Sequence, residues 1–225
     1  MWSKKGFTLT ELVVAMMLVA GIAMILMPSL VADNEKQVYA TALKKVYAQL
    51  QQTYQAVGML QARGQISQGS MFYAYKDTLE KTTKIVPDNQ KIKYLDAYSA
   101  KPDDCVVVKD VLKCPNGIVL KNGMFLFFDE NVYKVMNKDD ATKQESEYYI
   151  ITVDVNGKKS PNTVGKDIFY FLIKKDIETG ITKIVPRGEP HDNDAYGVCS
   201  AEKNDYTGCA YRILEGEGNG KIDYY

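Results

Sequence analysis

Histidine and cysteine are both scarce in this sequence of 225 residues. There is one histidine, His191, and there are four cysteines, none of which precedes Cys105. The histidine lies in a polar, turn-like stretch, without the nucleophile and orienting group that hydrolytic catalysis requires. No two cysteines have the close spacing that is typical of a zinc site. We therefore predict that the protein is not an enzyme and that it holds no zinc.

Net charge and composition argue against two further classes of protein. The sequence has 28 basic and 28 acidic side chains, and a net charge of zero argues against a nucleic-acid binder that works through overall positive charge. A charged fraction of 25% and a hydrophobic fraction of 46% are typical of globular proteins and exclude wholesale disorder. The length allows one large domain or two small ones.

Charge is almost absent from the N-terminal part of the chain. Between Lys5 and Asp33 the only ionisable side chain is Glu11, and residues 12–32 form the uncharged run LVVAMMLVAGIAMILMPSLVA. As a helix this run is about 30 Å long, which is the thickness of the hydrocarbon core of a bilayer. Because Lys4 and Lys5 precede the run, the positive-inside rule places the N-terminus in the cytoplasm and the chain after the run outside.

We compare this run with several known kinds of membrane segment. A cleaved secretory signal fits poorly, because the run exceeds the roughly 7–15 apolar residues of such signals and ends without a small-residue cleavage site. A lipoprotein anchor is excluded, because no cysteine lies near the run. An ordinary uncleaved anchor explains the hydrophobicity but not Glu11, since a carboxylate at the edge of a membrane helix is costly and indicates a function.

The residues around Glu11 resemble the processing signature of type IV prepilins. A short basic leader ends in Gly6 and is followed by FTLTE, which ends at Glu11, and then by the apolar run. The resemblance implies that a prepilin peptidase cuts between Gly6 and Phe7 and methylates the new amine. It also implies that Glu11 pairs with the N-terminal amine of a neighbouring subunit, since a carboxylate in hydrocarbon needs a cation. Thr10 departs from the family, which more often has an aliphatic residue there.

The resemblance covers about residues 1–35 and includes Pro28, which removes a backbone donor and produces a kink or a stretch that can unwind locally. Its implied partners are other pilin subunits, the prepilin peptidase and an assembly platform of the bacterial inner membrane. We divide the chain into a cleaved leader at 1–6, a transmembrane and assembly helix at 7–32, an amphipathic continuation at 33–63 and an extracytoplasmic, β-rich head at 64–225.

The helix is predicted to continue beyond the membrane. Hydrophobic side chains recur at spacings of three and four, which is typical of one face of an amphipathic helix. The members of this stripe are Tyr39, Leu43, Val46, Leu50, Tyr54 and Val57. No residue breaks the pattern before Gly64, so we predict one helix from Phe7 to about Arg63, about 85 Å long. We expect the stripe to dock on the head.

The second half of the chain indicates strands. Apolar runs at 118–121 and 124–128 flank Asn122 and Gly123, which predicts a hairpin with a type I′ turn. Three further strands are predicted at 148–153, 168–173 and 181–185. The predicted fold class is therefore α+β and pilin-like, with one long helix packed on an antiparallel sheet.

Two segments are predicted to connect or follow these elements. Residues 64–100 are a connecting region with one short helix, which carries Met71, Tyr75 and Leu79 and is capped by Ser70. The tail from Arg187 is expected to be rich in loops.

The four cysteines allow three pairings, and the sequence alone leaves all three open. All four follow the membrane segment, on the side expected to be oxidising. We favour the local pairs Cys105–Cys114 and Cys199–Cys209, because each closes a short loop. The second pair resembles the C-terminal disulfide loop of many pilins.

A Gly- and Pro-containing loop at 154–167 is a candidate calcium site. Its oxygen-bearing side chains are Asp154, Asn156, Asn162 and Asp167, and hard oxygen ligands on a tight loop suit Ca²⁺. Some type II secretion pseudopilins carry calcium on a similar loop. Three lysines in the same loop and the absence of EF-hand spacing weaken this interpretation. The alternative, which we favour, is a structural loop whose Asp and Asn side chains bind their own backbone. No other cofactor is expected.

The function predicted from these features is assembly. We expect a structural subunit of a type IV pilus or a type II secretion pseudopilus. It would lie first in the bacterial inner membrane with its head outside, and then in an extracellular pilus or a periplasmic pseudopilus. Two alternatives stay open: a minor pilin, tip adhesin or DNA-uptake pilin with a binding head, and, less favoured, a membrane-anchored extracytoplasmic enzyme.

Overall fold

The computed structural model describes residue 6 and residues 8–65, 71–87, 90, 106–108, 111–113, 117–136, 142–188 and 197–215. At 27–33, 71, 106–108, 111–113 and 145 the description is limited to the backbone. The chain divides into two compact units, Met1–Val38 and Tyr39–Tyr225.

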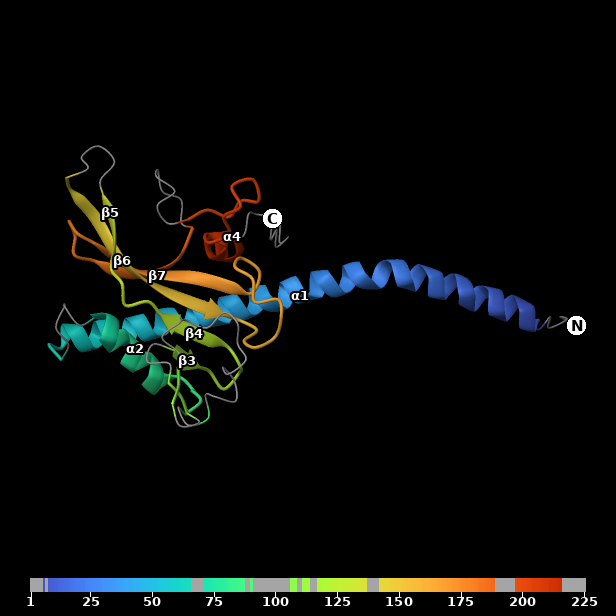
Figure 1. The fold of residues 1–225 in the computed structure, drawn as a ribbon, viewed down its shortest axis with the longest axis horizontal. Coiled ribbons are helices and arrows are strands. Elements are labelled where there is room, and N and C mark those ends of the chain that lie inside the picture. Colours follow the sequence, from blue (N-terminus) through green and yellow to red (C-terminus); the bar gives the residue numbers. More distant parts are fainter. Residues whose placement is uncertain are drawn as a thin grey trace, which may run out of the picture. The chain divides into compact units, whose positions relative to one another are not determined.

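A single helix of 54 residues, α1 (Leu9–Ala62), begins in the first unit and ends in the second (Figure 1). The prediction of one long helix is therefore confirmed. In the first unit its apolar residues follow one another without a helical period. From Tyr39 onward its buried residues recur every three or four positions, and Leu43, Leu50 and Val57 are fully buried in the main hydrophobic core. This periodic stripe packs α1 against a sheet, as predicted.

The second unit contains an antiparallel sheet of six strands. Their bounds are β3 (Gly117–Val119), β4 (Phe125–Phe128), β5 (Tyr133–Met136), β6 (Gln144–Asp154), β7 (Ile168–Asp176) and β8 (Thr182–Pro186). The order is β3-β4-β6-β7-β8, and β5 pairs with the first half of β6 while β4 pairs with its second half. A separate two-stranded ribbon consists of β1 (Val106–Val108) and β2 (Val111–Lys113).

The sheet has two apolar faces, because successive residues of a strand point to opposite sides. Six odd-numbered residues in the middle of β6 and β7 lie opposite one another and belong to the core that includes α1. They are Tyr149, Ile151, Val153, Phe169, Phe171 and Ile173. Tyr47 of α1 stacks on Phe171 with ring centroids 5.5 Å apart. Even-numbered residues of both strands form a second, smaller core with Val135 and Val185.

A second helix, α2 (Met71–Thr82), packs on the same core and confirms the predicted short helix. The Tyr75 hydroxyl donates to the backbone carbonyl of Leu50 in α1 at 2.9 Å. Burial raises the pKa of Tyr75 well above its ordinary value, so the hydroxyl stays protonated and remains a donor. Phe72 of α2 packs against β6, because its ring stacks on that of Tyr149 with ring centroids 4.6 Å apart.

Side chains from α1 also close the outer edge of β8. Gln51 donates from Nε2 to the carbonyl of Ile184 at 2.7 Å, and the Tyr54 hydroxyl donates to the carbonyl of Thr182. Uncovered carbonyls on an edge strand are a site for pairing with another chain. The helix therefore covers both a face and an edge of the sheet.

The hairpin between β3 and β4 has a different turn from the one predicted. The carbonyl of Leu120 accepts from the N–H of Gly123 at 2.9 Å, and the N–H of Leu120 donates to the carbonyl of Met124 at 2.9 Å. Gly123 has a φ of +93°, whereas Asn122 has no positive φ. A type I′ turn needs positive φ at both central residues, so that prediction is wrong. The loop has three residues and ends in a left-handed glycine.

Two elements were not predicted, namely β5 and a C-terminal helix, α4 (Cys209–Glu215). The tail from Arg187, predicted to be rich in loops, contains this helix as well. Cys209, Ala210 and Ile213 of α4 are buried in the main core. The coarse class, α+β with an apolar N-terminal helix and an antiparallel sheet, is confirmed. A pilin-like fold stays a prediction, as does the division at residues 6, 32 and 63.

Candidate functional site

The first unit contains a helical stretch, Leu9–Leu26, that is long and apolar enough to cross a membrane, with a mean hydropathy of 2.4. Within the described part of the chain none of this stretch is buried, and twelve of its side chains are large, hydrophobic and exposed. Burying one such side chain is worth about 1.5–3 kcal/mol. Twelve together exceed the entire unfolding free energy of an ordinary domain, about 5–15 kcal/mol. Covering this stretch with a bilayer or another protein would therefore be strongly favourable.

The only carboxylate of this stretch, Glu11, binds the beginning of α1. The backbone N–H and the hydroxyl of Thr8 both donate to Oε2 of Glu11 at 2.8 Å. In return the N–H of Glu11 donates to the Thr8 hydroxyl oxygen at 3.3 Å. This reciprocal pair is a capping box, which satisfies two N–H groups that the first turn of a helix leaves without partners. The role of Thr8 was not predicted, although the T-x-x-E spacing is itself the sequence signal for it.

The capping box uses one of the two oxygens of Glu11. Both bonds from Thr8 end on Oε2, and no bond to Oε1 is found among the described residues. The side chain is exposed, and it lies at the helix N-terminus, whose partial positive charge favours an anion. Within the part of the chain that the structure describes, Oε1 therefore keeps its capacity to accept a further bond.

Gly6 lies just before this box, and packing gives no reason for a glycine there. The residue is exposed, and a Cβ added to it would meet no atom within 4 Å. Phe7 lies outside the described residues. Cleavage and methylation at the Gly6–Phe7 bond therefore stay a prediction.

The backbone of α1 stays helical through Pro28, so this stretch is not unwound here. Proline has no N–H, and the carbonyl one turn earlier therefore loses its usual helical partner. The predicted role of Pro28 in assembly stays a prediction.

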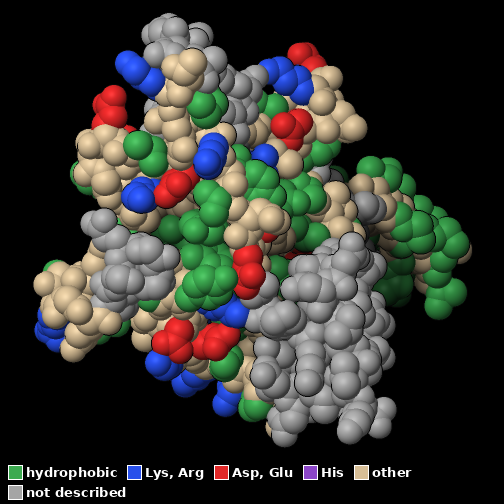
Figure 2. Space-filling model, turned by 60° about the vertical axis from the view of Figure 1, so that its left-hand side comes forward, with side chains coloured by type: hydrophobic (Ala, Val, Ile, Leu, Met, Phe, Trp, Pro, Cys, Tyr) green, Lys and Arg blue, Asp and Glu red, His purple; other side chains and the backbone are tan. Residues whose placement is uncertain are grey.

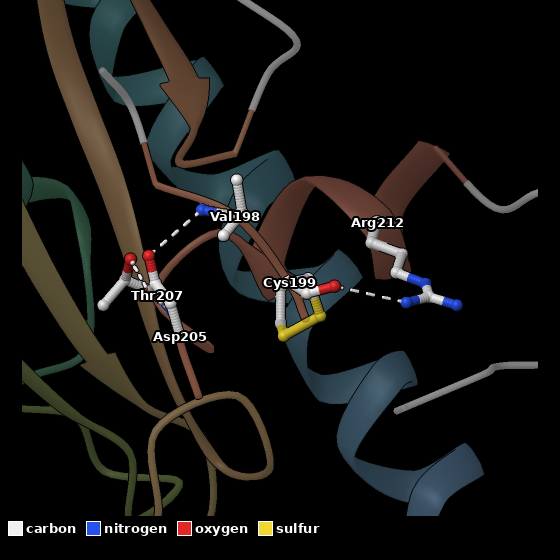
Figure 3. Close-up of a disulfide and its surroundings, with 6 residues drawn as sticks. Val198, Cys199, Asp205, Thr207 and Arg212 are labelled. Carbon is white, nitrogen blue, oxygen red and sulfur yellow. Dashed lines mark hydrogen bonds between the residues drawn. A yellow bond between two sulfur atoms is a disulfide. The ribbon is translucent and has the colours of Figure 1, made fainter. Parts of the chain in front are cut away.

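A disulfide between Cys199 and Cys209 holds the C-terminal segment (Figure 3). It matches one of the two favoured pairs, whereas Cys105 and Cys114 lie outside the described residues. Cys209 begins α4 and is fully buried. Arg212 of α4 donates back to the carbonyl of Cys199 at 3.3 Å. The disulfide and this bond together fasten α4 to the loop that precedes it.

Asp205 organises the loop that the disulfide closes. Its Oδ1 accepts from the N–H of Thr207 at 2.9 Å and from the Thr207 hydroxyl at 2.6 Å, and its Oδ2 accepts from the N–H of Val198 at 3.4 Å (Figure 3). Partial burial acts to raise the pKa of Asp205. The bonds from Thr207 and Val198 and the charge of Arg187 outweigh that effect, so the pKa lies below its ordinary value. The carboxylate is therefore ionised at neutral pH, the form that accepts these bonds.

The candidate calcium ligands lie on one loop and bind its backbone. Asp154 and Asp167 are fully buried. Oδ1 of Asp154 accepts from the N–H groups of Asn156 and of the residue after it, at 3.1 and 2.7 Å. The oxygens of Asp167 accept from the N–H groups of Asn162 and Thr163 at 2.8 and 2.6 Å. These contacts support the structural-loop interpretation, and calcium binding stays a prediction.

The predicted site residues fall into separate groups rather than one centre. Gly6 and Glu11 belong to the first unit, whereas the disulfide and the 154–167 loop belong to the second. Among the residues that the structure describes, no three His, Cys, Asp or Glu side chains come together in a group that could hold a metal ion. Comparison of the chain with protein-family models, curated proteins and solved structures finds no match.

Proposed function

We propose that the chain is a structural subunit of a type IV pilus or a type II secretion pseudopilus. In this proposal it is processed between Gly6 and Phe7 and assembles through the apolar part of α1. The observation that carries the proposal is the environment of Glu11. It is the lone carboxylate of the otherwise uncharged and exposed stretch Leu9–Leu26, with one oxygen bound to its own helix terminus and the other without a bond among the described residues. In hydrocarbon the open oxygen requires a donor, preferably a cation.

A second copy of the chain supplies such a donor. Cleavage after Gly6 removes Lys4 and Lys5 and leaves the amine of Phe7 as the cation at the start of each helix. When Oε1 of Glu11 accepts from a neighbour's amine, the capping box is preserved, because the box uses Oε2. Side-by-side packing of the helices also covers the exposed hydrophobic side chains of Leu9–Leu26.

The proposal places the subunit in the bacterial inner membrane before assembly, with its N-terminus in the cytoplasm and its second unit outside. Its partners are further copies, a prepilin peptidase and an inner-membrane assembly platform. The Cys199–Cys209 disulfide suits an oxidising compartment. The role is structural and not enzymatic.

Mass spectrometry of the mature N-terminus tests the processing step. We expect a chain that begins at Phe7 and carries one added methyl group. Gly6→Val is a matched variant, because the open space around Gly6 accepts a side chain without disturbing the fold. This variant should keep its leader and still form the Cys199–Cys209 disulfide. An intact Met1 in the unmodified protein, or cleavage near Ala32, would contradict the proposal.

Filament formation tests the pairing of Glu11. Glu11→Gln and Glu11→Ala are expected to enter the membrane and to fold their second unit, but to form few or no filaments. Thr10→Val is the matched control, because it lies beside Glu11 on the same helix turn and, among the described residues, its hydroxyl bonds that of Thr8 and not the carboxylate. Normal filaments from Glu11→Ala, or the same defect in Thr10→Val, would contradict the proposed pairing.

A further inference from the structure

A cavity of about 620 Å³ opens between the C-terminal part of α1, the beginning of α2 and one end of the sheet. Its lining residues come from α1, α2, β6, β7, the turn before β8 and the first residue of β8, elements that Figure 1 locates. Figure 2 brings this side of the molecule forward and shows hydrophobic side chains running between charged ones. All lining residues belong to the second unit. The volume lies within the range of small-molecule sites, about 300–1,000 Å³.

The floor of the cavity is aromatic and held in place by packing. The ring of Tyr149 stacks on that of Phe72, with centroids 4.6 Å apart and planes 24° apart. Ile173 lies directly opposite Tyr149 on β7 and extends the apolar surface. Phe72 and Ile173 are buried, whereas Tyr149 is half-buried. A partly exposed ring on a rigid apolar floor suits the flat apolar face of a ligand ring.

Polar groups surround this floor, and their charges cancel. Nζ of Lys175 lies 3.3 Å from Oε1 of Glu147, which is directly opposite it on β6. Gln61 adds an amide from α1. Burial and the Glu147 carboxylate raise the pKa of Tyr149, against a smaller opposing effect of Lys175, so the phenol stays protonated and remains a donor. The rim thus offers donors and acceptors without net charge.

We propose that this cavity binds a neutral oligosaccharide. A sugar ring has an apolar face of C–H groups that packs on an aromatic ring, and hydroxyls at its edge that bind carboxylate, ammonium and amide groups. An anion bound to Lys175 would lie beside the Glu147 carboxylate, and a cation bound to Glu147 would lie beside Lys175. A wholly apolar ligand would desolvate the ion pair without replacing its hydrogen bonds to water. A neutral ligand with both an apolar face and hydroxyls avoids each of these costs.

Saturation-transfer-difference NMR on the full-length chain tests the proposal, in micelles of a detergent without a sugar headgroup. The probes are maltotetraose, cellotetraose and chitotetraose, with anionic sialyllactose and zwitterionic tetraglycine as comparisons. We expect saturation transfer to at least one neutral tetrasaccharide and none to the two comparison ligands. No transfer to any of the three neutral probes, or stronger transfer to sialyllactose or tetraglycine, would overturn the proposal.

Variants locate the binding in this cavity. Gln61→Ala should raise the Kd of the bound tetrasaccharide about fivefold to tenfold, the effect of one lost hydrogen bond. Gln55→Ala is the matched control, because Gln55 is an exposed glutamine on the same helix that does not line the cavity. Tyr149→Ala should abolish transfer, with its fold checked by tyrosine circular dichroism. An unchanged Kd in Gln61→Ala, or an equal rise in Gln55→Ala, would overturn the site.

The binding proposal is independent of the filament proposal, because no lining residue lies in the first unit. Glu11→Ala, which is expected not to assemble, should bind the tetrasaccharide with unchanged Kd. If the chain forms filaments but does not bind the tetrasaccharides, only the binding proposal is overturned. Sugar binding without filaments would overturn the assembly proposal alone.

Discussion

Replacing Thr8 with valine removes the side-chain bonds of the capping box while keeping the shape of the side chain. The Thr8 hydroxyl donates to Oε2 of Glu11 at 2.8 Å and accepts from the Glu11 N–H at 3.3 Å. Valine can make neither bond. The bond from the Thr8 backbone N–H to the same carboxylate, at 2.8 Å, does not depend on the side chain. The substitution therefore isolates the contribution of the hydroxyl.

The expected cost lies between about 1 and 2 kcal/mol. Loss of an N-cap side chain costs about 0.5–2 kcal/mol in water-soluble helices. One of the two bonds is long for an N–H···O contact, which favours a value near the middle of that range. Exclusion of water at a membrane surface raises the value, because the freed N–H of Glu11 then has no replacement partner. A cost of 1–2 kcal/mol corresponds to a local opening constant about 5 to 30 times larger.

Amide hydrogen exchange of the full-length chain in micelles, measured by NMR, reports this constant at the N–H of Glu11. Thr8→Val should accelerate exchange there by the stated factor. Thr10→Val is the control, because the Thr10 hydroxyl lies 3.2 Å from the Thr8 hydroxyl but does not bind Glu11. The reasoning is refuted if Thr8→Val leaves the exchange rate unchanged, or if Thr10→Val accelerates it equally.

Three further predictions concern the second unit. Replacing Cys199 and Cys209 together by serine should lower the free energy of unfolding by about 3 kcal/mol, because the disulfide joins residues ten apart and restricts the unfolded chain. Urea unfolding followed by tyrosine circular dichroism measures this loss, and a loss below about 1 kcal/mol would contradict it. Asp205→Asn should destabilise the protein near neutral pH but not in acid. The pKa of Asp205 is lower in the folded than in the unfolded protein. Its carboxylate therefore contributes fully to the free energy of unfolding above the unfolded pKa, and this contribution is lost as the pH falls through the folded pKa. A difference in unfolding free energy between the two proteins that grows on acidification would contradict this. Leu50→Ala should lower the free energy of unfolding by about 2–5 kcal/mol, because Leu50 is fully buried. Met59→Ala, at a side chain that is 60% exposed, should lower it by less than about 1 kcal/mol. Equal losses in urea unfolding would show that the stripe on α1 is not packed.

The elements that were predictable are those whose burial follows a regular period. On α1 the fully buried Leu43, Leu50 and Val57 recur every seven residues, so the face that docks on the sheet was visible in the sequence. In β6 and β7 both faces are buried, which gives long runs of apolar and aromatic residues. Such runs identify a strand, but they do not say which strand lies beside it. The pairing of β4 and β5 with two halves of β6 therefore had to come from the structure.

The elements that were missed are short and depend on tertiary contacts. In β5 only Val135 is buried, and the strand exists because it pairs with β6. The helix α4 has seven residues, too few for a stable helix by propensity alone. It is held by the disulfide at Cys209 and by burial of Ala210 and Ile213. The turn at Gly123 was misjudged because an Asn-Gly pair favours a two-residue turn, whereas the register of β3 and β4 requires three residues.

The candidate sites differ in how far the sequence could reveal them. The T-x-x-E spacing contains the signal for the Thr8 partner of Glu11, although that partner was not predicted, and only the structure shows that both bonds from Thr8 end on the same carboxylate oxygen. The carbohydrate cavity could not be predicted at all, because Gln61, Phe72 and Tyr149 are far apart in the sequence and meet only when α1, α2 and β6 pack together.

The kind of cap at the start of α1 bears on the choice between a simple anchor and an assembling subunit. A neutral glutamine at position 11 would accept the same bond from the Thr8 N–H without placing a charge at the edge of the hydrocarbon. For a helix that only anchors the chain, the charge brings no contact beyond those a glutamine would make, since Oε1 accepts no bond among the described residues. For a helix that packs against its own copies, that oxygen fixes the position of a neighbour's amine. The apolar side chains of Leu9–Leu26 attract any hydrophobic surface equally, because burial has no direction. Glu11 is therefore the one charged group within Leu9–Leu26 that can set the register between copies.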